Sequence, residues 1–575
     1  MTFDLRGFEL DGETGEAGRN GARPGAGGRS EAWPAAGAGH DPARDALDVL
    51  AQAFGVVTER GAPGSGARQR TWLDTFDWRL NRAGLVLEYE RASRGGRLLL
   101  SRDDLPQAEQ PVTGWQPRRP RLAQDLPAGP VRDQIFKLVS PRALLPVARA
   151  ASTVSVSRLL NADGKTVARL IVDRSTASQG DVTADLPPRL AIAEVRGYPG
   201  QARRAARLLA GVPGVSPVSH SVFAVALDAL GRHPGDYTNG VDAEITAQMP
   251  APIAVATLLL RLLDTLEQNV DGVLRDIDTE FLHDLRVAVR RTRSAIKLLG
   301  GVLPDGLAGS YAAEFKWLGD LTTPTRDLDV HLLGFGAMVE HLVAATAADL
   351  EPFRAFLLRR RAREFRRLAA GLRSARFKAI TDHWRKALVE VRDAGGPRKR
   401  RREPTAGELA ISTTGRAFRK IVAHGSAITP ESPPESLHDL RKRAKELRYL
   451  LEFFAPLHDP VTYKKVIGEL KQLQDCLGEF QDSQVQREEI HALADAMLAE
   501  RAAPAATLLA MGEIVANLAI SQAEAREDFA MRFARFAGPA GQERFRILLA
   551  EPAEALLTSA PDGAGLTSAP DGPGA

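Results

Sequence analysis

The chain has 575 residues, of which 44% are hydrophobic and 6% aromatic. This length exceeds what one hydrophobic core organises, so we expect two to four domains of ordinary globular composition. The 76 basic residues nearly balance the 72 acidic ones, which leaves a formal net charge of +4. Any electrostatic function must therefore depend on where charges gather and not on their sum. A single cysteine, Cys476, excludes an internal disulfide and fits a reducing compartment.

The sequence shows no secretion or membrane signal. The N-terminal residues lack an apolar core and include Asp4 and Glu9. The most apolar run, residues 253–263, contains Arg261 and is too short to cross a bilayer. We therefore expect a cytoplasmic protein with no membrane partner. Residues 1–40, rich in Gly, Ala, Arg and Glu, are expected to be a disordered leader, and residues 551–575, which contain LTSAPDG twice, a disordered tail.

Residues 41–230 are predicted to form one α+β domain. Short apolar segments separated by Gly and Pro predict strands, followed by a helix at residues 200–209. The strand segments are residues 85–87, 98–100, 154–156, 168–172 and 190–195. Many short strands with few helices indicate an antiparallel barrel or an α+β fold. Residues 231–250, which begin with GRHPGDYTNG, are expected to be a linker.

Residues 251–550 are predicted to be helical nearly throughout. Proline and glycine gather only at residues 301–306, 395–405 and 429–434, which predicts breaks between helices there. The segment divides into two repeats, at about residues 251–390 and 406–550. The sequence thus predicts a second, all-α domain.

An internal duplication supports this division. EFLHDLRVAVRRTRSAIKLL (280–299) and ESLHDLRKRAKELRYLLEFF (435–454) share seven of twenty residues without a gap, at an offset of 155. At the same offset, EFKWLGDLTTPTRDLDV (314–330) and ELKQLQDCLGEFQDSQV (469–485) share six of seventeen. Asp327 and Asp482 each follow the histidine of their own repeat by 44 residues.

Basic residues in both repeats fall on one side of a helix. At 100° per residue they fill an arc of about 80°, beside a separate apolar stripe. The first row is His283, Arg286, Arg290, Arg293 and Lys297. The second row is His438, Arg441, Lys445 and Arg448, with Glu452 in the fifth place. The first stripe is Leu282, Leu285, Val289, Ile296 and Leu299, and the second is Leu437, Leu440, Ala444, Leu451 and Phe454.

Rows of like charge are usually solvated surface, and that interpretation stays open here. Such rows destabilise a helix by about 0.2–0.5 kcal/mol per pair, so their presence in both repeats favours an anionic ligand that relieves the repulsion. Arginine binds phosphate with two hydrogen bonds, lysine acts as a point charge, and histidine adds a donor. Lys316 and Lys471, which also correspond, are expected to extend the site. Asp327 and Asp482 are expected to order its basic residues or to act as plain helix caps.

Residues 251–550 resemble the CHAD family, the conserved histidine α-helical domain. HDLRVAVRRTRS and HDLRKRAKELRY are similar to its two signature helices, and WLGDLTTPTRDLDV and LKQLQDCLGEFQD to the helices that follow. The resemblance implies two helical bundles related by pseudo-two-fold symmetry. It also implies that the basic residues bind inorganic polyphosphate and that the protein associates with polyphosphate granules.

Residues 41–230 resemble a CYTH domain, an antiparallel β tunnel that binds triphosphates. WLDTFDWRLNRAGLVLEYER (72–91) and AIAEVRG (191–197) carry this resemblance. The ExExK strand of CYTH enzymes is not found between residues 41 and 60, and Glu88 and Glu90 stand where the family has basic residues. The resemblance is therefore to a degenerate CYTH domain without catalytic residues or a metal site.

Three functions follow from these observations. The first is non-enzymatic binding of polyphosphate, with no cofactor. The second is a CYTH-type triphosphatase tethered to polyphosphate, which would require Mg²⁺. The third is binding of nucleic acid by the basic helices, although these rows lack the aromatic residues that stack on bases until Tyr449. A polyphosphate site would in any case attract nucleic acid without sequence specificity.

Overall fold

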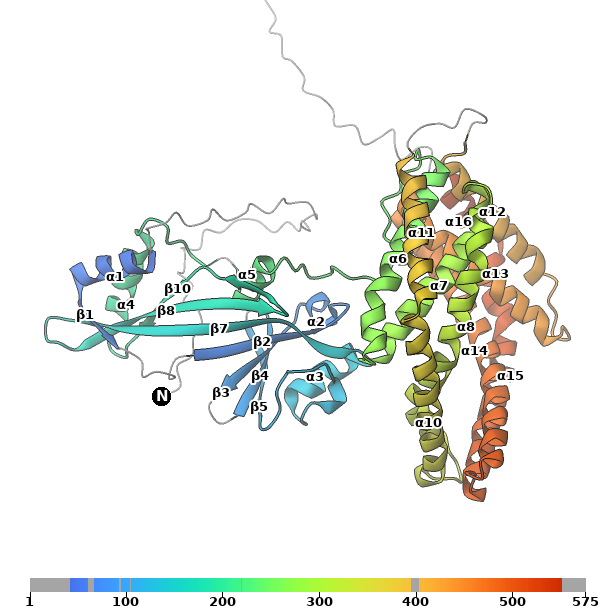
Figure 1. Cartoon of the computed structure of the whole chain (residues 1–575), viewed down its shortest axis with the longest axis horizontal. Coiled ribbons are helices and arrows are strands. Elements are labelled where there is room, and N and C mark those ends of the chain that lie inside the picture. Colours follow the sequence, from blue (N-terminus) through green and yellow to red (C-terminus); the bar gives the residue numbers. More distant parts are fainter. Residues whose placement is uncertain are drawn as a thin grey trace, which may run out of the picture. The chain divides into compact units, whose positions relative to one another are not determined.

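The structure is a computed structural model that describes residues 42–59, 67–92, 95–103, 105–218, 220–394 and 403–550. The predicted leader and tail lie outside these residues. The chain divides into two compact units, Met1–Thr238 and Asn239–Ala575. As Figure 1 shows, the first unit contains the strands, and the secondary-structure elements in the described part of the second unit are helices.

The first unit contains an antiparallel sheet of ten strands, so the expected antiparallel architecture is confirmed. Seven strands pair in the order β10-β8-β7-β2-β3-β4-β5, while β1 and β6 pair with β7, and β9 pairs with β8. The sheet is open, because no ladder among the described strands joins β10 to β5, so the expected closure into a tunnel or barrel is not seen in the described strands. The strands are β1 Gly55–Glu59, β2 Ala67–Thr75, β3 Val86–Ala92, β4 Gly95–Arg102, β5 Leu105–Val112, β6 Arg121–Leu122, β7 Ala143–Leu160, β8 Thr166–Gln179, β9 Val182–Asp185 and β10 Arg189–Glu194.

The predicted segments of this unit agree with the structure. The five predicted strand segments lie in β3, β4, β7, β8 and β10 to within one residue, and the predicted helix lies in α4 (Pro199–Ala210). The other helices of the unit are α1 (Pro42–Ala53), α2 (Arg79–Arg82), α3 (Pro130–Val139) and α5 (Val222–Ala229).

Side chains alternate between the two faces of the sheet, and different helices cover the faces. Leu73, Leu87 and Tyr89 pack in one cluster with Val131 and Ile135 of α3. Trp72, the next residue along β2, points to the other face, where its ring lies 5.6 Å from that of Phe223 in α5. Apolar contacts therefore fix both faces near the middle of the sheet. A further apolar cluster packs β7, β8 and β10 against α1 and α4.

The second unit is a helical bundle, and its helices begin at corresponding positions in the two repeats. The helices are α6 Ala251–Leu274, α7 Thr279–Leu299, α8 Leu307–Leu333, α9 Phe335–Glu340, α10 Ala347–Leu372, α11 Ala375–Asp393, α12 Ala406–Gly425, α13 Pro434–Phe453, α14 Pro460–Ala499, α15 Ala505–Ala537 and α16 Pro539–Ala550. Helix α12 begins 155 residues after α6, and α13 begins 155 residues after α7. The duplicated segments are thus equivalent helices.

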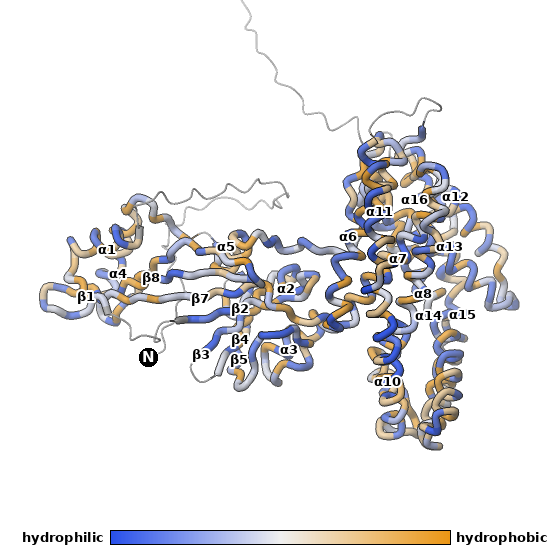
Figure 2. Tube along the Cα trace, viewed as in Figure 1, coloured by the Kyte–Doolittle hydropathy of each residue, from blue (hydrophilic) through white to orange (hydrophobic). Residues whose placement is uncertain are grey.

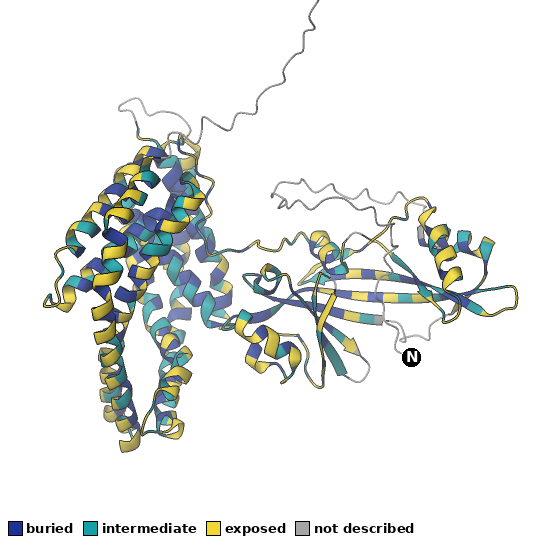
Figure 3. Ribbon diagram, turned by 180° about the vertical axis from the view of Figure 1, so that it is seen from behind, coloured by how far each residue is buried: buried dark blue, intermediate teal, exposed yellow. Residues whose placement is uncertain are grey.

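The apolar stripes predicted for α7 and α13 form part of the core. All ten stripe residues are buried, and Figure 3 shows buried residues facing inward along the bundle. Asp278 begins α7 by accepting hydrogen bonds from the backbone N–H groups of Glu280 and Phe281. Burial of one face fixes how each helix is rotated, so the adjoining basic rows have defined directions.

Helix α15 is the one described helix whose length and composition would suit a membrane span. Its apolar window has a mean hydropathy of 1.3, and 22% of the window is buried. The sequence pattern had drawn attention to residues 253–263 instead. Ala510, Met511 and Ile514 of α15 pack in a cluster with Phe353 of α10, although most of the apolar window is not buried.

Candidate functional site

A cavity of about 520 Å³ lies between helices of the two repeats, and we call it the inter-repeat pocket. Its walls are α7 of the first repeat and α13 and α14 of the second. The lining residues are Asn239, His283, Val287, Arg290, Arg291, Arg441, Lys445, Arg448, Tyr449, Glu452, Gln474, Asp475, Gly478, Glu479 and Asp482. Six of the predicted site residues are among them, namely His283, Arg290, Arg441, Lys445, Arg448 and Asp482.

Positive charges from both repeats converge on Lys445. Burial lowers the pKa of this ammonium group to about 8, and neighbouring Arg441 and Arg290 act in the same direction. Arg290 belongs to α7, whereas Arg441 and Lys445 belong to α13. The Arg290 guanidinium also lies over the ring of Tyr449, 5.9 Å from its centroid. The pocket thus brings basic residues of both repeats together, and its lining also includes four carboxylates, those of Glu452, Asp475, Glu479 and Asp482.

Carboxylates hold three of the surrounding arginines in place. Arg441 donates to Asp482 at 2.6 Å. Glu452 accepts from Arg291 of α7 at 2.8 Å and from Arg448 of α13 at 2.7 Å, so it joins the two repeats. Arg291 was not predicted from the sequence, and Glu452 was placed in the basic row without a role. Glu452 in the second basic row was the one feature of the sequence that indicated an acidic partner for these arginines.

The two histidines have different surroundings. His283 lines the inter-repeat pocket. His438 lies outside it, where its Nδ1 atom is 2.6 Å from Oε1 of the buried Gln481. The corresponding histidines therefore do not occupy equivalent positions around the cavity.

Arg286 and Asp327 form a second, half-buried centre away from the inter-repeat pocket. Arg286 donates to the Thr323 hydroxyl group on α8. Burial lowers the pKa of Arg286 and raises that of Asp327, and the attraction between the two groups opposes both shifts. Asp327 thus neighbours a basic residue of its own repeat, as Asp482 does in the second repeat.

The remaining predicted residues lie outside the inter-repeat pocket. Arg293 is exposed and lies against Gly319, where a Cβ atom would be 2.8 Å from its guanidinium. Lys297 pairs with Glu446 at 2.6 Å and lines a different cavity of about 470 Å³. Lys316 pairs with Asp320 at 2.6 Å, and Lys471 is exposed.

A long basic stretch, from Arg354 to Lys378 in α10 and early α11, is largely occupied by ion pairs. Figure 2 shows it as a hydrophilic section of α10. Arg361 lies 2.5 Å from Asp329 and 2.7 Å from Asp276, while Arg367 pairs with Glu364. None of its residues lines the inter-repeat pocket. Among the described residues, no group of three or more His, Cys, Asp or Glu side chains could hold a metal ion.

The second unit contains a segment that matches a known domain family. The family model described as the CHAD domain matches residues 257–491. Residues 257–491 form a CHAD domain. This domain contains α7, α8, α13 and most of α14, and therefore every residue predicted for the site.

Solved structures give weaker likenesses. The CHAD domain from the plant Ricinus communis is 23% identical, with a TM-score of 0.43, over 52% of this chain and 97% of that one. PptA from Streptomyces chartreusis is 16% identical, with a TM-score of 0.39, over 49% and 99%. A protein from Bacillus halodurans described as a candidate adenylate cyclase is 14% identical, with a TM-score of 0.21, over 31% and 88%. No curated protein sequence matches the chain significantly.

Proposed function

We propose that the CHAD domain binds inorganic polyphosphate in the inter-repeat pocket. The observation that carries this proposal is the convergence of Arg290, Arg441 and Lys445 from two repeats around one cavity of about 520 Å³. A polyphosphate chain has a negative charge on every unit, so it would relieve the repulsion among these cations along its length. The resemblance to the CHAD family implies the same ligand.

This function requires no chemistry on the ligand. Arg290 is exposed and Arg441 and Lys445 are half-buried, so a chain laid over the pocket can reach all three. Asp482 and Glu452 hold Arg441 and Arg448 in place, which reduces the side-chain entropy lost on binding. We further propose that the protein is cytoplasmic and associates with polyphosphate granules through this domain.

The experiment compares two triple variants of the full chain. The first, R290A/R441A/K445A, removes three charges from the inter-repeat pocket. The second, R293A/K316A/K471A, removes three charges that the sequence equally predicted but that lie outside it. Long-chain polyphosphate binding is measured by fluorescence anisotropy over a series of salt concentrations.

We expect the pocket variant to lose affinity by about a hundredfold or more, because several charge-assisted hydrogen bonds to phosphate disappear together. The slope of log affinity against log salt should become shallower by about 0.7–0.9 for each phosphate that is no longer neutralised. The control variant should stay within about threefold of the parent. Equal losses of affinity in both variants would show that the basic rows act only as general surface charge.

Nucleic-acid binding is tested by using RNA of matched charge as a competitor. Tyr449, the aromatic residue of the pocket, is buried and covered by Arg290, so it is not free to stack on a base. RNA should therefore compete weakly and mainly at low salt. If RNA competed as strongly as polyphosphate, nucleic acid would become the favoured ligand of the domain.

A CYTH-type triphosphatase is the less favoured function of the first unit. Glu90 pairs with Arg68 and Arg97, and Arg97 also pairs with Glu109 at 3.0 Å. Arg70 lies 3.5 Å from Asp173 and donates to Ser152. The arginines on this face of the sheet are thus neutralised by the protein itself. We expect no Mg²⁺-dependent phosphate release from tripolyphosphate, and such release would support the enzyme.

A further inference from the structure

A second cavity, of about 450 Å³, lies in the first unit, on the face of the sheet opposite the ion-paired arginines. Its lining residues are Gln69, Arg70, Thr71, Tyr89, Arg91, Gln116, Pro117, Arg118, Arg149, Ala150, Ala151 and Ser178. The lining contains four arginines and no Asp or Glu. Arg70 turns away to Ser152 and Asp173, so Arg91, Arg118 and Arg149 remain, and we call these three the arginine cluster.

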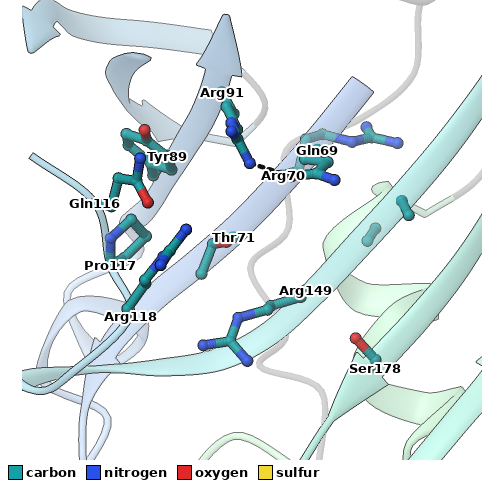
Figure 4. A pocket seen from close by; sticks show the side chains of 12 residues that line it. Gln69, Arg70, Thr71, Tyr89, Arg91, Gln116, Pro117, Arg118, Arg149 and Ser178 are labelled. Carbon is teal, nitrogen blue, oxygen red and sulfur yellow. Dashed lines mark hydrogen bonds between the residues drawn. The ribbon is translucent and has the colours of Figure 1, made fainter. Parts of the chain in front are cut away.

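Strand register shows that these side chains share a face. Tyr89 lies directly opposite Thr71 on β2, and Thr71 lies opposite Arg149 on β7. Arg91 lies opposite Gln69, two residues further along, and donates to it at 3.4 Å. Because directly paired residues point to the same side, the arginines of β3 and β7 flank the same strip of β2. Figure 4 shows them on either side of Thr71.

The third arginine comes from the segment between β5 and β6. Trp115 in this segment packs edge-on against Tyr89, with ring centroids 5.4 Å apart. Pro117 is buried, and the Arg118 backbone N–H donates to the Gln116 carbonyl. The segment is thus anchored to the sheet, and it holds Arg118 over the strip that faces Arg149, as Figure 4 shows.

The two faces of the sheet differ in how their charges are balanced. On one face Arg68, Arg97 and Arg70 are paired with carboxylates. Among the described residues no carboxylate pairs with a member of the arginine cluster, and all three members are exposed. Three exposed guanidinium groups around one cavity create a local positive potential that a phosphate anion would neutralise.

We propose that the arginine cluster binds a compact phosphate anion, either inorganic diphosphate or the phosphate end of a phosphate ester. Guanidinium groups bind tetrahedral oxyanions with paired hydrogen bonds, and the hydroxyl groups of Thr71 and Ser178 supply further donors. The cavity is large enough for more than one phosphate group. This site belongs to the first unit alone and does not depend on the proposed function of the CHAD domain.

The experiment uses the full chain in the R290A/R441A/K445A background, which removes the inter-repeat pocket as a competing anion site. Calorimetry measures the binding of inorganic pyrophosphate, orthophosphate and glycerol phosphate. R118A/R149A is then added to this background. The matched control is R119A/R121A, which removes two exposed arginines from the adjoining sequence that do not line the cavity.

We expect one pyrophosphate to bind per chain, with about a tenfold or greater loss of affinity in R118A/R149A and less than about a twofold loss in the control. Tighter binding of glycerol phosphate than of pyrophosphate would identify the ester as the ligand class. Absence of binding to all three probes would overturn the proposal, and so would equal losses in the two arginine variants. Circular dichroism of each variant establishes that the sheet is retained.

Discussion

Lys445 occupies a position where burial and like charges act in the same direction. Both favour its neutral form, and its pKa falls from 10.5 to about 8. Below about pH 8, where Lys445 is charged in both states, this group destabilises the folded protein. Between pH 8 and 10.5 the folded protein has lost the proton that the unfolded chain still holds, so the free energy of unfolding increases with pH. A bound polyanion favours the ammonium ion and raises its pKa again. Ligand binding and protonation of Lys445 are consequently coupled.

We predict that polyphosphate affinity decreases as the pH rises from 7 to 10. Above pH 8 the free protein loses the Lys445 proton and must take it up again to bind, which costs up to about tenfold in affinity per pH unit. K445R should flatten this dependence, because arginine stays charged. The measurement is anisotropy at constant ionic strength, with K471R as the control, which should follow the parent. An unchanged profile in K445R would contradict the coupling.

Individual residues also show what the sequence could and could not predict about the site. Arg290, Arg441 and Lys445 were predicted from helical periodicity, because burial of the adjoining apolar stripe fixes their direction. Arg291 was missed, since it lies outside the basic arc and reaches the pocket through contacts with Glu452 of the other repeat and with the Asn239 carbonyl group. Such pairing depends on how two helices cross. The hydrophobic periodicity of one helix does not predict that crossing.

At the scale of elements, contacts between α7 and α13 define the inter-repeat pocket. Two glutamates of α13 reach basic residues of α7. The pair between Glu452 and Arg291 is well shielded, with 15% and 13% of the side chains exposed. The pair between Glu446 and Lys297 is open, with 29% and 70% exposed. The interface between α7 and α13 therefore contains one ion pair that is shielded from water and one that is exposed to it.

We predict that E452Q lowers the free energy of unfolding of the helical unit by about 1–3 kcal/mol, because Arg291 and Arg448 lose their shielded partner. E446Q should change it by less than about 1 kcal/mol, as for other exposed pairs. The measurement is urea unfolding followed by circular dichroism of the helices. Equal effects of the two substitutions would show that Glu452 does not hold the helices together.

The turn between α6 and α7 depends on a glycine. A Cβ atom at Gly272 would lie 2.1 Å from the ring of Phe281, so the first turn of α7 packs directly on the backbone of α6. G272A should destabilise the unit by about 1–3 kcal/mol through overpacking. Gly468 in α14 is the control, since nothing lies within 4 Å of its added Cβ. G468A should instead stabilise the helix by about 0.5–1 kcal/mol in the same unfolding measurement. A neutral G272A would contradict this packing.

At the scale of the whole molecule, the near balance of charge limits what a general field can do. With 76 basic and 72 acidic residues, long-range attraction of polyanions is weak, so binding depends on local clusters. The inter-repeat pocket and the arginine cluster are two such places, one in each unit. Arg361 and Arg367 in the basic stretch of α10 are paired with carboxylates of the protein, and they line neither cavity.

Much of the architecture was predictable, because duplication and hydrophobic period are properties of the sequence. The 155-residue offset anticipates that α6 and α7 correspond to α12 and α13. The sequence did not reveal which residues of the two rows meet. Arg293 lies outside the pocket although its helical position suited it, and Lys471 lies outside although it corresponds to Lys316 in the repeat. Nor did it reveal the arginine cluster, because Arg91, Arg118 and Arg149 come from separate elements that only the sheet register brings together.

The most direct test of polyphosphate binding between the repeats is a crystal structure of the full chain with a bound polyphosphate of defined length. We predict a phosphate chain in the inter-repeat pocket, where it touches Arg290 of the first repeat and Arg441 and Lys445 of the second. A chain bound elsewhere, such as along α10, or bound by one repeat alone, would contradict the proposed function.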